Sequence, residues 1–309
     1  MNAIARPMKP FERPDGAGAP PFPFQPEKAD VSHIRRKWLD IPYASVSAAQ
    51  QLDLYLPDAG EGPFPVVVDI HGGGFELGDK RDPHILAFLR GLERGYAVAS
   101  LNYRLSGEAT FPAGLQDVKA AIRWLRAHAA EYHLEPSRIA ACGASAGGNY
   151  AAMVCVTGGV PVFDDPSLGN IGYPCDVQAA IDWFGPIDFL TMDEQLAASG
   201  LEPCDHSRPE SPESRYLGAP VMEVPERARL ASPMTYVGND MPPILIQHGT
   251  ADNLVPFQQS VEFARAIEER AGRDKCELDL FEGWGHDDPR FSSDENLARV
   301  FDFIGRHLK

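Results

Sequence analysis

Several features that mark other classes of protein are missing from this chain of 309 residues. It has no run of about 18 consecutive apolar residues, so no membrane-spanning helix is predicted. Basic residues are outnumbered and form no run longer than three residues: 28 Lys and Arg stand against 44 Asp and Glu, a formal net charge of −16. Because nucleic acids are bound by clustered positive charge, they are not expected as partners.

Cysteine is also scarce, and the first residues contain no apolar segment of signal-peptide length. The five cysteines are odd in number and have no CxxC spacing, which argues against a disulfide framework and a zinc site. We therefore expect a soluble, cytoplasmic protein with reduced thiols and without a metal or organic cofactor. The sequence does not indicate an oligomeric state. The cysteines are Cys142, Cys155, Cys175, Cys204 and Cys276.

From residue 51 onward, short apolar runs alternate with Gly- or Pro-bearing turns and segments of helical periodicity. Such alternation predicts an α/β fold, in which a mostly parallel sheet has helices on both faces. Eight apolar runs are candidate strands, so we expect an eight-stranded sheet. They are residues 38–43, 52–56, 66–70, 97–103, 139–142, 177–183, 244–247 and 277–281.

The remaining pattern gives an outline of the domain. Residues 1–30 are rich in proline and predict an extended arm, and residues 31–309 predict one catalytic domain. Between about 158 and 239 the pattern loosens, apart from the strand near 177–183, which indicates an inserted cap or lid. Helical periodicity is clear after Pro112 and in the last segment, where Ser292 and Glu295 form a candidate capping box.

A G-x-S-x-G pattern provides a candidate nucleophile. Residues 143–148 read Gly-Ala-Ser-Ala-Gly-Gly, directly after a candidate strand and before helix-forming sequence. In this context the glycines allow a tight strand-to-helix turn that exposes the hydroxyl of Ser145 above the sheet. The alternative is a flexible turn of small residues. We predict that Ser145 is the nucleophile of an acyl-transfer reaction.

A second glycine turn supplies candidate donors for the negative charge that such a reaction develops. Residues 71–75, His-Gly-Gly-Gly-Phe, follow the candidate strand 66–70. Consecutive glycines let backbone N–H groups approach an oxyanion, so Gly73, Gly74 and Ala146 are the predicted oxyanion-hole residues. A phosphate-binding loop is the competing interpretation, but GxxxxGK[ST] and GxGxxG are both absent. His71 is expected to hold this loop by hydrogen bonds.

Two further residues follow strand ends at the positions that a catalytic triad requires. Asp252 comes just after the strand 244–247, and His286 lies on a glycine-flanked loop after the strand 277–281. The chain order Ser145, Asp252, His286 is the one expected for a serine hydrolase of this sheet type. His286 would act as the base and Asp252 would orient it. His248 is expected to be a buried histidine, and Asp287 a solvated loop acid.

Taken together, these motifs resemble the α/β-hydrolase superfamily, in particular the esterase branch related to hormone-sensitive lipase and bacterial carboxylesterases of the acetyl xylan or feruloyl esterase-like type. The resemblance covers roughly residues 35 to 309. It implies a serine carboxylesterase that acts on a small-molecule ester with a short acyl group, including acetyl or feruloyl esters of plant polysaccharide. The motifs are residues 71–75, 143–148, 182–186, 250–252 and 285–286.

The same fold and triad serve other activities, so several alternatives stay open. An acyltransferase would resolve the acyl-serine with an alcohol, a peptidase would cleave an amide, and a receptor would have lost catalysis. Four side chains are candidates for contact with substrate: Phe75, Trp183, Phe184 and His206. Trp183 and Phe184 are explained equally well as core aromatics.

Overall fold

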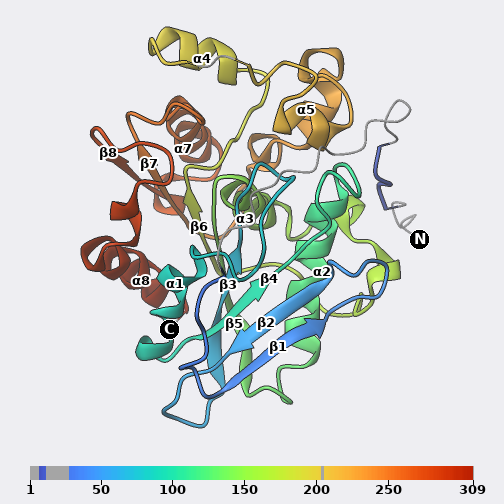
Figure 1. The fold of residues 1–309 in the computed structure, drawn as a ribbon, viewed down its shortest axis with the longest axis vertical. Helices are drawn as coiled ribbons and strands as arrows, with labels where there is room; N and C mark the ends of the chain where they lie inside the picture. The colour runs from blue at the N-terminus through green and yellow to red at the C-terminus, as the bar shows by residue number, and fades with distance from the viewer. Residues whose placement is uncertain (1–6, 12–27, 203–204, 309) are drawn as a thin grey trace.

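An eight-stranded sheet forms the centre of the computed structural model, which describes residues 7–11, 28–202 and 205–308 (Figure 1). The strand order is β1-β2-β4-β3-β5-β6-β7-β8. β2 is antiparallel to both β1 and β4, and all other pairs are parallel. The strands are β1 (Lys37–Pro42), β2 (Gln51–Tyr55), β3 (Phe64–Ile70), β4 (Ala97–Leu101), β5 (Leu134–Ala144), β6 (Ala179–Trp183), β7 (Ile244–Gly249) and β8 (Cys276–Phe281).

Helices cover both faces of this sheet. The α-helices of the described residues are α1 (Ile85–Leu89), α2 (Ala113–Ala127), α3 (Ala146–Thr157), α4 (Met192–Ala198), α5 (Pro212–Leu217), α6 (Pro225–Leu230), α7 (Gln258–Arg270) and α8 (Asp294–Leu308). Buried side chains of α2, α3 and α7 pack on one face, and those of α1 and α8 pack on the other. None of the helices in these ranges is long and apolar enough to cross a membrane.

Alternation along the strands explains the two apolar layers. On β3, Val66, Val68 and Ile70 face α2 and α3, whereas Val67 faces α1 and α8. Successive side chains of a strand point to opposite faces, so a strand covered on both sides is apolar along most of its length. All eight strands were predicted from their apolar runs, and the predicted sheet is confirmed.

Two boundaries differ from the sequence-based expectation. β5 begins at Leu134, five residues early, because Leu134 pairs with Phe64 of β3 across a register shift. The last helix is capped by Ser293, whose Oγ accepts a hydrogen bond from the amide of Asn296 at 3.3 Å. Ser292 instead ends the preceding 3-10 turn, so the predicted capping box was wrong by one residue.

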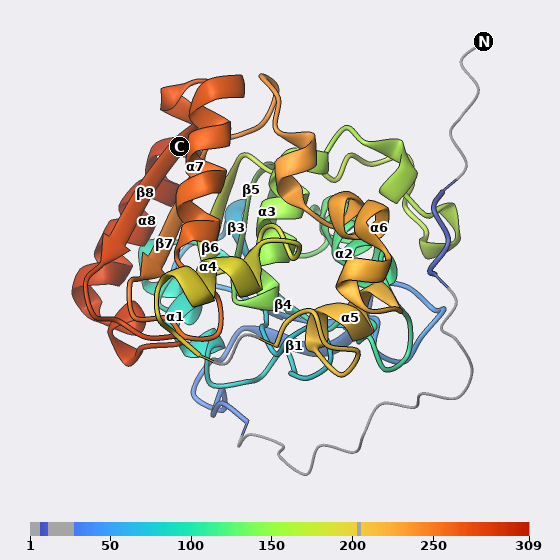
Figure 2. The same ribbon diagram turned by 90° about the horizontal axis from the view of Figure 1, so that it is seen from above.

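The segment 158–239 contains β6, α4, α5 and α6. Figure 1 shows α4 and α5 beyond the upper end of the sheet, and Figure 2, viewed from above, shows α4 in front of α3 and α5 to one side of it. The interruption of this segment by a central strand agrees with the sequence analysis. That the segment acts as a cap remains a prediction.

Most of the predicted N-terminal arm, residues 1–6 and 12–27, lies outside the described residues. Residues 7–11 contact α2, where Gln116 Nε2 donates to the carbonyl oxygen of Met8 at 2.7 Å. The amide of Met8 donates to the carbonyl oxygen of Val162 at 2.8 Å, and the ring of Phe11 stacks on Phe111 with 6.3 Å between centroids. This part of the arm is therefore attached to the domain.

Candidate active site

Ser145 lies on a sharp turn between β5 and α3. Its backbone angles are φ 54° and ψ −122°, which residues other than glycine rarely adopt. A Cβ on Gly147 would lie 1.9 Å from the carbonyl oxygen of Ile70, and one on Gly143 would lie 2.2 Å from that of Gly147. The amide of Ser145 donates to the carbonyl oxygen of Trp183 on β6 at 2.8 Å. The glycines are thus required by close backbone packing, and the turn is a fixed one.

Three polar side chains meet at the carboxyl ends of β5, β7 and β8. His286 Nε2 lies 3.0 Å from Ser145 Oγ, and His286 Nδ1 lies 2.7 Å from Asp252 Oδ2. The Asp252 side chain is fully buried, whereas that of His286 is 13% exposed. A carboxylate only accepts hydrogen bonds, so this contact assigns the ring proton to Nδ1. Nε2 is then left to accept the hydroxyl hydrogen of Ser145.

A second imidazole, which the sequence did not connect with the site, contacts the same carboxylate. His248 Nε2 lies 3.2 Å from Asp252 Oδ2 and 2.9 Å from the carbonyl oxygen of Val255. The amides of Leu254 and Val255 donate to Asp252 Oδ1 at 2.9 and 2.8 Å. Burial raises the pKa of Asp252, but the hydrogen bonds from His248 and His286 outweigh it and hold this pKa well below its ordinary value. Asp252 is therefore ionised at neutral pH.

The glycine turn after β3 lies directly against the Ser145 turn. A Cβ on Gly72 would lie 3.4 Å from Ser145 Cβ and 2.9 Å from the carbonyl oxygen of Ala144. Gly73 and Gly74 have φ values of +102° and +59°, which favour glycine. In the described ranges, no backbone carbonyl accepts a hydrogen bond from the amides of Gly73, Gly74 or Ala146. These N–H groups remain available to an anionic oxygen bound beside Ser145.

His71 holds this glycine turn in place. Its ring stacks on Tyr103 with 4.4 Å between centroids, and its Nδ1 lies 2.8 Å from the carbonyl oxygen of Gly72. The hydroxyl of Tyr103 donates to the carbonyl oxygen of His71 at 2.9 Å. Burial lowers the pKa of His71. This arrangement agrees with the expectation that His71 fixes the loop.

Two of the four expected substrate contacts are the last residue of β6, Trp183, and the residue that follows it, Phe184. Trp183 is 1% exposed, and its ring centroid lies 5.1 Å from that of Phe88. Its Nε1 donates to Gln247 Oε1 at 2.7 Å, so Trp183 is a core residue. The ring of Phe184 is also buried and lies 4.7 Å from the ring of His286. Phe184 thus supports the imidazole by packing. The core alternative that the sequence left open applies to both aromatics.

The other two expected contacts are Phe75 and His206. Phe75 directly follows the three glycines of the turn, and His206 lies in the segment 158–239. Phe75 has a φ of +64° and stacks on Tyr216 of α5 with 4.0 Å between ring centroids. His206 Nδ1 lies 3.1 Å from Oε1 of Glu213, also on α5. Burial lowers the pKa of His206, but the Glu213 carboxylate outweighs it and raises this pKa above its ordinary value. Contact of Phe75 or His206 with substrate remains a prediction.

Asp182 on β6 is a buried carboxyl group next to the start of α3. Its Oδ1 accepts a hydrogen bond from the amide of Gly185 at 2.9 Å, and a Cβ on Gly148 would lie 2.4 Å from the same oxygen. Burial raises the pKa of Asp182 to about 6. The group therefore binds its proton more tightly in the folded chain than in the unfolded one.

This raised pKa has a consequence for stability. The contribution of Asp182 is fully present below the ordinary Asp pKa of about 3.9 and is lost as the pH rises through about 6. Asp182→Asn removes the titration, so we expect the stability of the variant relative to wild type to increase from about pH 4 to about pH 6 and then to level off. Urea unfolding at a series of pH values measures this difference, with the exposed Asp240→Asn as control. A difference that does not change with pH contradicts the raised pKa.

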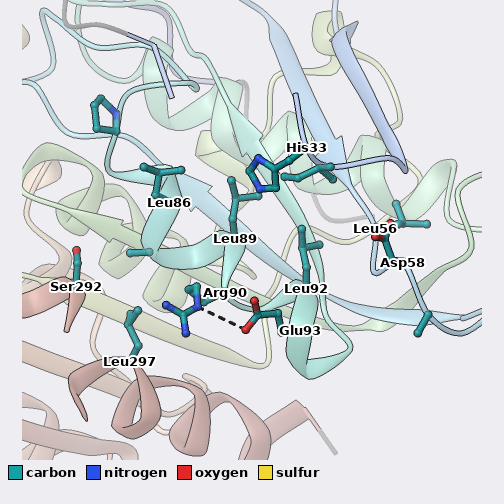
Figure 3. A pocket seen from close by; sticks show the side chains of 14 residues that line it. His33, Leu56, Asp58, Leu86, Leu89, Arg90, Leu92, Glu93, Ser292 and Leu297 are labelled. Carbon is teal, nitrogen blue, oxygen red and sulfur yellow. Dashed lines mark ion pairs between the residues drawn. The ribbon is translucent and has the colours of Figure 1, made fainter. Parts of the chain in front are cut away.

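A cavity of about 710 Å³ lies between α1, α8 and the segment before β1 (Figure 3). Its walls are mostly apolar and include Leu89 and Leu297. Arg90 and Glu93 also line it, and Arg90 Nε lies 3.6 Å from Glu93 Oε2. Ser145, His286 and Asp252 do not line this cavity. The candidate active site is thus on another part of the molecule.

Comparisons with known proteins identify relatives of this chain. The model of the BD-FAE family matches residues 52–267, more than half of the chain. The probable carboxylic ester hydrolase LipM of Mycobacterium tuberculosis is 32% identical over 231 residues, which are 72% of this chain and 50% of LipM. The chain spans about half the length of such curated relatives.

Two solved structures are similar over most of the chain. A truncated carbohydrate esterase from gut microbiota has a TM-score of 0.80 and 30% identity, covering 91% of this chain and 99% of its own. A bifunctional GH43-CE protein of Bacteroides eggerthii has a TM-score of 0.80 and 32% identity, covering 88% of this chain and 35% of its own. The predicted α/β-hydrolase fold is confirmed by these esterase neighbours and by the strand order. On the family match over residues 52–267, the chain belongs to the BD-FAE family.

Proposed function

We propose that this chain is a serine carboxylic-ester hydrolase in which Ser145 is the nucleophile, His286 the general base and Asp252 the orienting acid. The observation that carries the proposal is the hydrogen-bonded chain from Ser145 Oγ through His286 to Asp252, with contacts of 3.0 and 2.7 Å. Its geometry is that of a nucleophile held within reach of a base whose tautomer is fixed. The names of the related ester hydrolases support the same reaction.

In the proposed acylation, Ser145 Oγ attacks the carbonyl carbon of the ester while its proton passes to His286 Nε2. The carbonyl oxygen becomes an oxyanion, which accepts hydrogen bonds from the amides of Gly73, Gly74 and Ala146. The proton then passes to the leaving alcohol as the ester C–O bond breaks, and an acyl-serine remains. Water attacks this intermediate, with His286 again as the base, and the acid is released.

We further propose that the substrates are esters with short acyl groups, including acetyl or feruloyl esters of plant polysaccharide. The similar solved structures are named as a carbohydrate esterase and as a bifunctional protein with a CE part, which supports a carbohydrate alcohol. The resemblance noted in the sequence supports the small acyl group.

Hydrolysis of p-nitrophenyl esters from acetyl to palmitoyl, together with acetylated xylan and methyl ferulate, tests this proposal. We expect the fastest turnover with the shortest acyl chains and release of free acid from at least one of the two plant-type esters. Products formed with an added alcohol distinguish an acyltransferase, and a peptide p-nitroanilide distinguishes a peptidase. Absence of turnover on every ester would contradict the proposed activity.

A further inference from the structure

Helix α5 packs along the glycine turn that carries the proposed oxyanion donors. A Cβ on Gly74 would lie 3.0 Å from Pro212 Cβ, so the first turn of α5 touches the peptide that holds one of these donors. One turn later, the ring of Tyr216 stacks on Phe75 at 4.0 Å with an angle of 9°. Two neighbouring residues of the turn are therefore covered by one face of the same helix.

A partly buried ion pair connects Glu76, the residue after Phe75, to helix α5. Arg215 Nη1 donates to Glu76 Oε2 at 2.8 Å, and the side chains are 24% and 8% exposed. Leaving a buried carboxylate without its partner destabilises the folded state. This ion pair therefore holds the end of the turn more firmly than an exposed ion pair would. Figure 1 shows α5 beyond the upper end of the sheet.

The glycine turn depends on such support because its own backbone is strained. Phe75 is a bulky aromatic residue at φ +64°, and such a conformation persists only where the surroundings enforce it. On the domain side the carbonyl oxygen of Phe75 accepts a hydrogen bond from the amide of Ser106 at 2.7 Å. Its ring is held by Tyr216, by Tyr150 at 5.4 Å and by Phe189 at 5.9 Å. Tyr216 makes the shortest of these ring contacts.

We infer that Arg215 and Tyr216 are positioning residues for the oxyanion hole, acting through Glu76 and Phe75. The inference rests on the proposed esterase function and adds to it a specific task for α5. Oxyanion donors act only when they are aimed at the oxygen of the tetrahedral intermediate, and a small displacement weakens them strongly. Loss of the contacts from α5 therefore lowers the stabilisation of the transition state, and leaves binding of the ester ground state nearly unchanged.

The test compares Arg215→Gln and Tyr216→Leu with wild type on p-nitrophenyl acetate. A second readout is the inhibition constant of a trifluoromethyl ketone. When Ser145 Oγ adds to its carbonyl carbon, the hydroxyl proton passes to His286 and the ketone oxygen becomes an oxyanion. The matching methyl ketone, which remains a neutral carbonyl, measures ground-state binding. Arg229→Gln is the control, because Arg229 forms an ion pair with Glu226 of α6 and does not touch the turn.

We expect kcat to fall about 10- to 100-fold in each variant, KM to change little, and the trifluoromethyl ketone to bind more weakly by a similar factor. The methyl ketone should bind as to wild type. Arg215→Lys and Tyr216→Phe, which restore the charge and the ring, should recover most of kcat. Unchanged kcat, or a lower kcat with full affinity for the trifluoromethyl ketone, overturns the inference.

One further variant covers the case in which Arg215→Gln does not fold. Glu76→Gln/Arg215→Gln removes both charges, so no unpaired carboxylate is left buried, and the same kinetic changes are expected. Thermal unfolding of every variant separates loss of fold from loss of positioning. If wild type has no Ser145-dependent ester turnover, the proposed function fails. If it has such turnover and the α5 variants retain kcat and inhibitor affinity, only the role of α5 fails.

Discussion

Ser145→Ala is expected to lower kcat for p-nitrophenyl acetate by about 10⁶-fold, because no other group can form the acyl intermediate. The fold should be retained. Among the described residues the side chain of Ser145 makes one hydrogen bond, to His286, and its position depends on the glycines around it. Stopped-flow and long-term hydrolysis assays measure the loss, and thermal unfolding verifies that the variant is folded.

A matched control for this variant is Ser137→Ala, on the same strand β5, where the hydroxyl donates to the nearby Glu135 Oε1 at 2.7 Å. A fluorophosphonate provides a second measurement, since it should label wild type once and Ser145→Ala not at all. Near wild-type activity of Ser145→Ala, or label on another residue, would show that the nucleophile has been assigned wrongly.

Asp252→Asn is expected to lower kcat by about 10⁴-fold while leaving KM similar. Asp252 Oδ2 lies within reach of nitrogen atoms of both His286 and His248. An amide NH₂ at this position donates, so His286 must accept at Nδ1 and carry its proton on Nε2. In that tautomer the ring cannot take the proton of Ser145. The measurement is kcat over a range of pH.

Asp287→Asn is the control, because Asp287 is the neighbouring exposed acid on the His286 loop. We expect it to retain most of the wild-type activity. If Asp287→Asn proved crippling and Asp252→Asn mild, the choice of the orienting acid would be wrong. Asp252→Asn should keep the hydrogen bonds from the amides of Leu254 and Val255, so it is expected to fold.

The fold and the meeting of Ser145, Asp252 and His286 could be predicted because each depends on a local signal. Buried parallel strands are continuous apolar runs, and their carboxyl ends lie at one edge of the sheet. Ser145, Asp252 and His286 each follow such a run, so their neighbourhood in space follows from the strand assignment. The glycines of 143–148 and 71–75 mark the close approaches that the structure contains.

What could not be predicted depends on contacts between distant segments that have no sequence pattern of their own. Arg215 and Glu76 are ordinary surface-type residues in the sequence, and their pairing arises only when α5 packs on the turn. Trp183 and Phe184 are adjacent aromatics, yet only Phe184 reaches His286, because successive residues point in different directions as the strand ends. Whether Ser292 or Ser293 caps the N-terminus of α8 likewise depends on the 3-10 turn that precedes this helix.

The long-range nature of these contacts also bears on how the chain gains its activity during synthesis or refolding. Glu76 and Arg215 are 139 positions apart, and Ser145 and His286 are 141 apart. Contacts that close such long loops form late, after local helices and turns. A nascent chain that has already formed α2 and α3 therefore still lacks the base. The proposed ester turnover would thus report the completed tertiary assembly of this protein, and in a refolding experiment it is expected to return after the helical circular dichroism signal.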